Sequence, residues 1–262
     1  MDSLIKKLTS RQWIQDIILG ISFLTRLPIP HSQPYKRFLM QSAWSFPLVG
    51  VFLGFLGGSV SWFLLELQLP LLIVSFLTIG TLILLTGGLH EDGLADMADG
   101  FGGGSNPENK IAIMRDSQIG TYGTLILILV IAVKAAAIET LLGKDNSLNC
   151  MVALIVSGSV SRSLMVCVAY TLDHASEKGL GKFAGKPNSQ TVISSLFITV
   201  ITSIFLLPII KVMIALTLAT LTATAIGFLA KRQINGYTGD ILGATQQLSE
   251  VIVLIYLATA VI

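Results

Sequence analysis

The sequence predicts an all-α integral membrane protein, a polytopic bundle of about seven transmembrane helices with its N-terminus in the cytoplasm. The chain of 262 residues is 53% hydrophobic and only 12% charged, whereas soluble domains carry about 25% charged residues. Its mean hydropathy is +0.78. Apolar runs of membrane-spanning length recur at 45–65, 71–88, 121–142, 149–171, 191–208, 211–230 and 248–262.

Residues 1–44 precede the first span and predict an N-terminal amphipathic helix. The apolar stretch in this segment carries Asp16 and Arg26 and ends in prolines, which is unlike a cleavable signal peptide. Apolar residues recur at helical spacing at Trp13, Ile14, Ile17, Ile18, Ile21 and Leu24. Such a helix either lies in the membrane interface or packs beneath the bundle, and the spacing does not choose between these two.

The lysines and arginines outside the seven spans indicate the orientation. Nearly all of them fall before the first span or in the loops 87–123, 173–190 and 231–250, and only Lys144 and Lys211 lie in the alternate loops. The positive-inside rule places the basic loops in the cytoplasm. We expect the whole chain, 1–262, to form one membrane-embedded catalytic domain whose cytoplasmic functional loops are these three.

The segment 87–104 (GGLHEDGLADMADGFGGG) concentrates ionisable residues in a chain that has few. Asp92, Asp96 and Asp99 stand at offsets of four, three and seven, which place their carboxylates on one face of a helix. Carboxylates held so close repel one another unless a cation lies among them, and Mg²⁺ prefers such oxygen ligands. We expect these aspartates, with Glu91, to bind Mg²⁺. A solvated acidic helix face is the alternative.

The segment 114–123 (MRDSQIGTYG) predicts a phosphate contact before the third span. The guanidinium of Arg115 would bind phosphate oxygens in bidentate fashion, or it would form only a loop ion pair with Asp116. Ser117, Thr121 and Tyr122 would add donors, because the start of a helix also favours an anion.

Other cationic side chains offer further anion contacts. Arg162 lies in the middle of a span, where it must find a partner or a wet cavity. It either pairs with an aspartate or reaches a substrate phosphate. Lys178, Lys182 and Lys186 alternate with glycines and form either a solvated loop or a phosphate-binding lid.

The segment 235–240 (NGYTGD) predicts a turn that starts the last helix. Asn235 and Thr238 are candidate substrate contacts, and Thr238 is also a plausible N-cap with Asp240 in the first turn. Asp240, Gln247 and Glu250 recur on one helical face. Asp240 would therefore either stabilise the helix start or extend the metal site.

Composition excludes some alternatives. The net charge of +2 is dispersed over the loops, without the basic stripe of nucleic-acid-binding proteins, so no nucleic-acid partner is expected. Cys150 and Cys167 are 17 residues apart in one span, or roughly 25 Å along a helix, and cannot pair with each other.

Three segments resemble the cobalamin synthase family, also called adenosylcobinamide-GDP ribazoletransferases. They are residues 87–103, 114–123 and 234–250, and FLTRLPIP at 23–30 is similar to the family's opening. The resemblance implies a multi-pass enzyme of the bacterial cytoplasmic membrane whose active site faces the cytoplasm. It would join adenosylcobinamide-GDP to α-ribazole, or its 5′-phosphate, and give adenosylcobalamin, or its 5′-phosphate, and GMP. The implied cofactor is Mg²⁺, and the oligomeric state is left open.

The predicted site suits this reaction. A ribose hydroxyl would attack the cobinamide-linked phosphorus while the aspartates held Mg²⁺ and Arg115 bound the phosphates. An aspartate or His90 would accept the hydroxyl proton. A CDP-alcohol phosphotransferase is an alternative, although Asp92-Gly93 lacks the Ala-Arg continuation of that family. A cation transporter or a structural subunit are the non-enzyme alternatives.

Overall fold

The computed structural model describes residues 2–29, 38–143, 147–175 and 184–260. In these ranges the regular structure is helical, and one isolated β-bridge joins His174 to Tyr237. The helices are α1 (Asp2–Leu24), α2 (Leu39–Ser42), the 3₁₀ turn η1 (Ala43–Ser45), α3 (Phe46–Glu66), α4 (Leu71–Thr86), α5 (Leu89–Gly103), α6 (Pro107–Met114), α7 (Thr121–Leu142), α8 (Ser147–Thr171), α10 (Ser189–Leu206), α11 (Ile209–Ile234) and α12 (Gly239–Ala260).

The predicted polytopic bundle is confirmed. Six helical segments within the described ranges are long and apolar enough to cross a membrane, and a seventh is counted if α4 and α5 are taken together. These two helices are bent by 91°, so the predicted span 71–88 corresponds to α4, and α5 turns away from it. The last helix begins at Gly239 rather than at 248, because its first turns are too polar to register as an apolar run.

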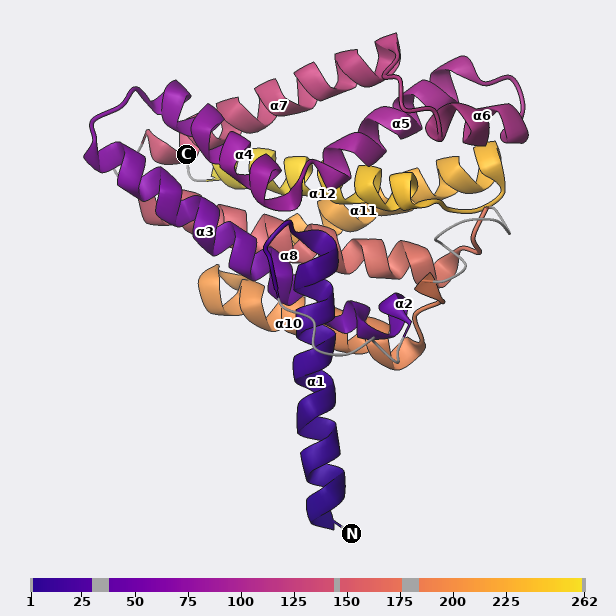
Figure 1. Cartoon of the computed structure of the whole chain (residues 1–262). Coiled ribbons are helices and arrows are strands. Elements are labelled where there is room, and N and C mark those ends of the chain that lie inside the picture. Colours follow the sequence, from indigo (N-terminus) through magenta and orange to yellow (C-terminus); the bar gives the residue numbers. More distant parts are fainter. Residues whose placement is uncertain (1, 30–37, 144–146, 176–183, 261–262) are drawn as a thin grey trace.

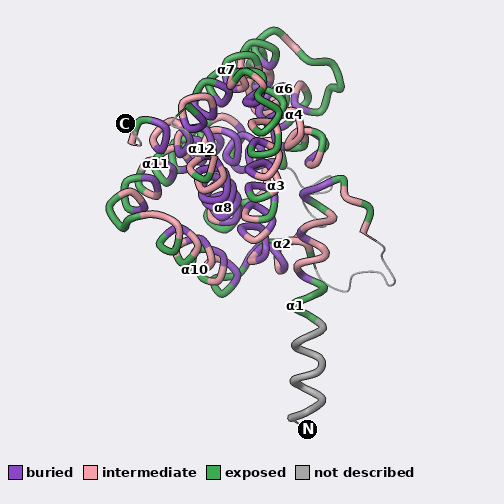
Figure 2. Tube along the Cα trace, turned by 90° about the vertical axis from the view of Figure 1, so that its left-hand side faces the viewer, coloured by how far each residue is buried: buried purple, intermediate pink, exposed green. Residues whose placement is uncertain are grey.

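Helix α8 forms the centre of the bundle (Figure 2). In the most apolar stretch of 18 residues in α8, 83% of the residues are buried. In the equivalent stretch of α12, 72% are buried. Helix α3 packs closely on α8 because small residues face it. A Cβ atom on Gly54 would lie 2.5 Å from the Cα atom of Ile155. Large apolar side chains on the outer helices are exposed, as expected of a surface that faces lipid.

Helix α1 crosses the direction of the long helices and projects from the bundle (Figure 1). The packed face of its C-terminal half consists of Asp16, Gly20 and Leu24, and Trp44 Nε1 donates a hydrogen bond to Asp16 Oδ2 at 2.8 Å. The predicted apolar stripe does not all face the bundle, since Trp13 and Ile14 are 66% and 58% exposed. One end of the helix is therefore packed, and its exposed apolar residues suit a membrane interface.

Two consecutive glycines produce the sharp turn between α4 and α5. Gly87 and Gly88 have φ angles of 69° and 68°, a left-handed conformation that costs other residues energy. The turn directs α5 along the first half of α12. As a result, α5, α6 and the start of α7 lie at the same end of the bundle as the start of α12 (Figure 1). We call this the polar end.

Candidate functional site

The polar loops meet at the polar end, as the sequence predicts. Backbone hydrogen bonds join the segment after α8 to the turn before α12, from Ala175 N to Tyr237 O at 2.8 Å and from Tyr237 N to Asp173 O at 2.9 Å. Lys110 on α6 donates a hydrogen bond to Gln233 on α11. Segments distant in the sequence are thus held together around α5 and the start of α12.

Helix α5 presents its aspartates on one side, and Asp240 of α12 lies close to them. A Cβ atom on Gly93 would lie 2.9 Å from the Cα atom of Asp240, so the two helices are nearly in backbone contact. Asp92 is exposed and Asp96 is half-buried. Burial, and after it the nearby carboxylates of Asp92, Asp240 and Asp99, together raise the pKa of Asp96 to about 7. The carboxylates of Asp92, Asp99 and Asp240 are thus close enough to Asp96 to act on it. We call the surface that carries Asp92, Asp96 and Asp240 the acidic face.

Asp99 has a role that the sequence did not reveal, as the cap of α7. Its Oδ2 accepts a hydrogen bond from Gly120 N at 2.7 Å, and its Oδ1 accepts one from Gly123 N at 2.9 Å. Cβ atoms at either glycine would collide with this carboxylate. An anion therefore does lie at the start of α7, and in the structure it is the carboxylate of Asp99.

The predicted hydrogen-bond donors at the start of α7 lie at the surface of the bundle. Thr121 and Tyr122 are exposed. The ring of Tyr122 packs over Gly102, where a Cβ atom would lie 2.5 Å from Tyr122 Cδ2. Thr121 and Tyr122 therefore lie at the surface beside α5, and their role as substrate contacts stays a prediction.

The loop before α7 places Arg115 near the carboxylates. Arg115 is exposed at the end of α6 and acts electrostatically on Asp240. Asp116 Oδ1 accepts a hydrogen bond from Gln118 N at 3.0 Å, which closes the turn, and Ser117 is exposed. Arg115 thus lies close enough to the acidic face to act on its charge.

The turn before α12 has the geometry predicted for a helix start. Thr238 Oγ1 accepts from Ile241 N at 3.4 Å and donates to Asp240 Oδ2 at 3.0 Å. Asn235 ends α11 in a left-handed conformation with φ 59°. The N-cap prediction is confirmed, and the same contact orients Asp240 toward the cluster on α5.

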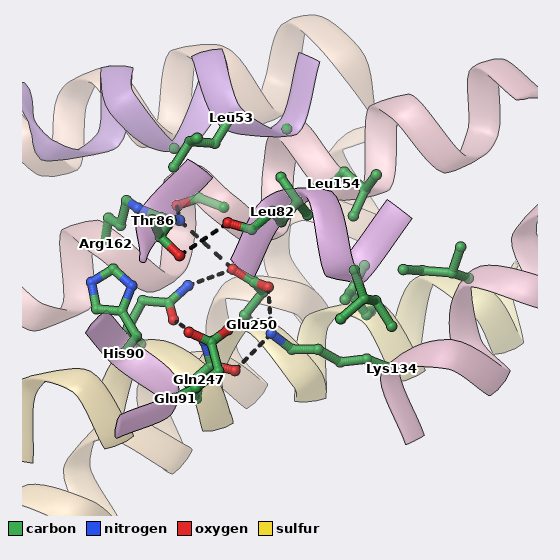
Figure 3. Close-up of a pocket in the computed structure, with 17 residues that line it drawn as sticks. Leu53, Leu82, Thr86, His90, Glu91, Lys134, Leu154, Arg162, Gln247 and Glu250 are labelled. Atoms are coloured by element: carbon green, nitrogen blue, oxygen red, sulfur yellow. Dashed lines mark hydrogen bonds and ion pairs between the residues drawn. The ribbon is translucent and has the colours of Figure 1, made fainter. Parts of the chain in front are cut away.

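Three predicted site residues lie elsewhere, inside the bundle (Figure 3). His90 is 2% exposed, and the cations Arg162 and Lys134 lie near its imidazole. Glu91 Oε1 accepts a hydrogen bond from Gln247 Nε2 at 2.8 Å. Arg162 is buried and pairs with Glu250, not with an aspartate. The structure therefore does not bring His90, Glu91 and Arg162 to the aspartate face, since their positions on α5 and α8 point inward.

Lys134 and Glu250 form the centre of this buried group. Lys134 Nζ lies 2.7 Å from Glu250 Oε1 and donates to Gln247 Oε1, also at 2.7 Å. Arg162 Nη1 lies 3.7 Å from Glu250 Oε2. Gln247 and Glu250 therefore belong to the interior, and they do not form one site with Asp240. Of the lysines in the candidate lid, Lys178 and Lys182 lie outside the described residues, and Lys186 pairs with the exposed Asp173.

The residues of the acidic face fit a magnesium ion bound together with a substrate. Among the described residues, no three His, Cys, Asp or Glu side chains converge as a complete metal site. Mg²⁺ commonly uses one or two carboxylates and takes its other ligands from water and substrate phosphates. Two of the three carboxylates of Asp92, Asp96 and Asp240 would supply that number, and a cation would relieve the repulsion that, after burial, raises the pKa of Asp96.

Comparison with known proteins identifies the family. The family profile described as cobalamin-5-phosphate synthase matches residues 16–258. The chain belongs to this family. A relative from Brucella anthropi is 38% identical over 256 residues, with 94% of this chain and 97% of that protein covered. Relatives from a Sinorhizobium species (36% identical; 94% and 97% covered) and from Allorhizobium ampelinum (33%; 97% and 100%) are similar over comparable lengths. All three are named adenosylcobinamide-GDP ribazoletransferase, and no solved structure matches.

Proposed function

We propose that this chain is a membrane-embedded transferase that joins adenosylcobinamide-GDP to α-ribazole or its 5′-phosphate. The products would be adenosylcobalamin, or its 5′-phosphate, and GMP. Membership of the cobalamin-5-phosphate synthase family along nearly the whole chain carries this proposal. The convergence of Asp92, Asp96 and Asp240 with Arg115 at one end of the bundle supports it.

The reaction exchanges one oxygen on phosphorus for another. The ribose hydroxyl oxygen of α-ribazole bonds to the phosphorus attached to cobinamide, and the bond from that phosphorus to the bridging oxygen breaks. GMP leaves with the bridging oxygen, and the hydroxyl proton passes to a base. Such transfers depend mainly on positioning and on neutralising charge.

The acidic face provides the groups that this exchange needs. Asp92, Asp96 and Asp240 would hold Mg²⁺. When bound, the ion would neutralise the diphosphate and the developing charge on GMP. Arg115 would bind phosphate oxygens in bidentate fashion and orient them. Because His90 is buried in the interior, we propose that an aspartate carboxylate accepts the hydroxyl proton.

We propose that the polar end faces the cytoplasm of a bacterial cell. This end carries the basic residues Lys110, Arg115, Lys186, Lys231 and Arg232, and such residues concentrate on the cytoplasmic side of membrane proteins. Both nucleotide-bearing substrate and GMP would then exchange with the cytoplasm.

Product analysis tests the proposed function. The full chain in lipid nanodiscs is given adenosylcobinamide-GDP, α-ribazole and Mg²⁺, and GMP and adenosylcobalamin are quantified by chromatography and mass spectrometry. We expect the two products in equal amounts, and no GMP when α-ribazole is omitted. GMP release that does not depend on α-ribazole would show a hydrolase, and no GMP under any condition would refute the transferase.

A further inference from the structure

The interior of the bundle holds a charge cluster contributed by four helices. Lys134 of α7 and Arg162 of α8 are positive, and Glu91 of α5 and Glu250 of α12 are negative, so the formal charges balance. Lys134, Arg162 and Glu250 are buried to 9% exposure or less. Removing one member of a buried ion pair is strongly destabilising because it leaves an uncompensated charge. The cluster thus constrains how these helices pack.

Gln247 connects this cluster to α5. Its Oε1 accepts the hydrogen bond from Lys134 Nζ at 2.7 Å, and its Nε2 donates to Glu91 Oε1 at 2.8 Å. The amide of Gln247 is therefore hydrogen-bonded to α7 through its oxygen and to α5 through its nitrogen. Because an amide has a defined donor end and acceptor end, both contacts form only in one orientation of its side chain.

The backbones of α5 and α12 approach each other closely near this contact. A Cβ atom on Gly93 would lie 2.9 Å from the Cα atom of Asp240, and one on Gly243 would lie 3.1 Å from His90 O. Glu91 immediately precedes Asp92, and Asp96 follows within about one and a half turns. A rotation of α5 about the glycine contact would therefore move both aspartates relative to Asp240.

A cavity lies beside the Glu91–Gln247 contact, so packing alone does not set the rotation of α5 there. The cavity is lined by His90, Glu91, Arg162 and Glu250 on its polar side, and it has a volume of about 30 Å³. His90 Nε2, Glu91 Oε2 and Arg162 Nε are buried without a hydrogen-bond partner among the described residues. A cavity of this size and polarity accommodates water, which would not hold a helix as a packed side chain does.

We propose that Glu91 and Gln247 are positioning residues, which transmit the packing of the interior cluster to α5 and so set Asp92 and Asp96 against Asp240. This inference rests on the proposed function for its catalytic readout. Under this proposal Glu91 does not bind the metal, and the buried cluster acts on the active site by fixing the position of α5.

Exchange of the two residues tests the proposal in nanodiscs. Glu91→Gln removes a charge that balances Lys134 and Arg162, and Gln247→Glu places a second carboxylate against Glu91. We expect each single variant to lose about 10- to 100-fold in kcat, since a displacement of about 1 Å can cost that much. The double variant restores both the donor–acceptor pair and the total charge, and we expect its kcat to return to within about threefold of wild type.

Metal binding provides a readout other than activity. Mn²⁺ titration followed by electron paramagnetic resonance measures binding at the carboxylates directly. We expect Mn²⁺ to bind about tenfold more weakly to each single variant and normally to the exchanged pair. Thr245→Val is the matched control, because Thr245 is buried in α12 and, among the described residues, its hydroxyl donates to Ile241 O of its own helix. The kcat and the Mn²⁺ affinity of this variant should stay at the wild-type values.

The outcomes separate the two proposals. Single variants with wild-type kcat and Mn²⁺ affinity, in an enzyme that releases GMP, would overturn the positioning role and leave the function standing. An exchanged pair as impaired as the single variants would also overturn it. A wild type that releases no GMP but whose Mn²⁺ affinity follows the expected pattern would refute the function and support the positioning. If Gln247→Glu does not fold, Gln247→Asn is used, and wild-type kcat and Mn²⁺ affinity there would refute the positioning role.

Discussion

Asp99 provides the sharpest test of the site, because the sequence and the structure assign it different tasks. As the cap of α7, its carboxylate accepts hydrogen bonds from Gly120 N at 2.7 Å and from Gly123 N at 2.9 Å. A hydrogen bond to a charged group contributes about 1.5–3 kcal/mol, and losing a cap typically costs about 1 kcal/mol. We therefore expect Asp99→Ala to lower the free energy of unfolding by roughly 2–4 kcal/mol.

The assay is thermal unfolding of the purified protein in one detergent, with chelator present so that metal does not contribute. For a chain of this size, 1 kcal/mol corresponds to roughly 2–4 °C in Tm, so a fall of about 5–15 °C is expected. Asp99→Asn keeps one carbonyl acceptor, so its Tm should lie between those of wild type and Asp99→Ala. Asp92→Ala is the control, because Asp92 is exposed, and it should change Tm little. If Asp99→Ala unfolds at the wild-type temperature under chelator, the carboxylate is not a cap and metal binding becomes its better assignment.

Four further outcomes follow. Gly54→Ala should lower Tm by several degrees and Gly80→Ala should not, because a Cβ atom meets the backbone of α8 at the first position and nothing within 4 Å at the second; equal Tm values would contradict the packing. Arg115→Lys should lose at least about tenfold in kcat, since a lysine cannot reproduce a bidentate contact; an exposed loop ion pair, worth at most about 1 kcal/mol, predicts normal rates instead. Glu250→Gln should cost about 3–5 kcal/mol, as breaking a buried ion pair does; unchanged unfolding in detergent would contradict this. The Mg²⁺ concentration for half-maximal GMP release should fall as pH rises from 6 to 8, because the proton on Asp96, whose pKa is about 7, competes with the metal; a pH-independent value would exclude that competition.

The spans were predictable because hydropathy alone determines them. Within the described residues, each predicted apolar run falls on a helix, and the six long helices and the bent pair account for all of them. The error at the start of α12 has a specific cause. Gln246, Gln247 and Glu250 are buried polar residues whose partners come from α5, α7 and α8, and a hydropathy window registers only their polarity.

The carboxylate face of α5 was also predictable, because helical spacing places Asp92, Asp96 and Asp99 together. The separate role of Asp99 was not, since it depends on two backbone N–H groups that come from 21 and 24 residues further along the chain. The two glycines that admit this carboxylate, Gly120 and Gly123, were the available signal. Their tight spacing around a helix start indicates that something approaches the backbone there.

The inward direction of His90, Glu91 and Arg162 needed the tertiary structure. Spacing places His90 and Glu91 about 200° and 100° from Asp92 around the helix, but it does not say which side faces the bundle. Ionisable residues inside spans are costly unless partnered. Lys134, Arg162 and Glu250 lie in or beside apolar runs, so the sequence indicates that they need partners of opposite charge. Which of them pair with one another depends on how the helices are arranged in space.

We propose that the carboxylates of Asp92, Asp96 and Asp240, and not the buried cluster, would hold the Mg²⁺ of the proposed reaction. The most direct measurement is a Mg²⁺ titration of GMP release from adenosylcobinamide-GDP and α-ribazole, with wild type and Asp96→Asn compared in matched nanodiscs. We predict that Asp96→Asn, at wild-type Tm, requires at least about tenfold more Mg²⁺ and turns over at least about a hundredfold more slowly. A titration curve and a maximal rate that coincide with wild type would contradict the account.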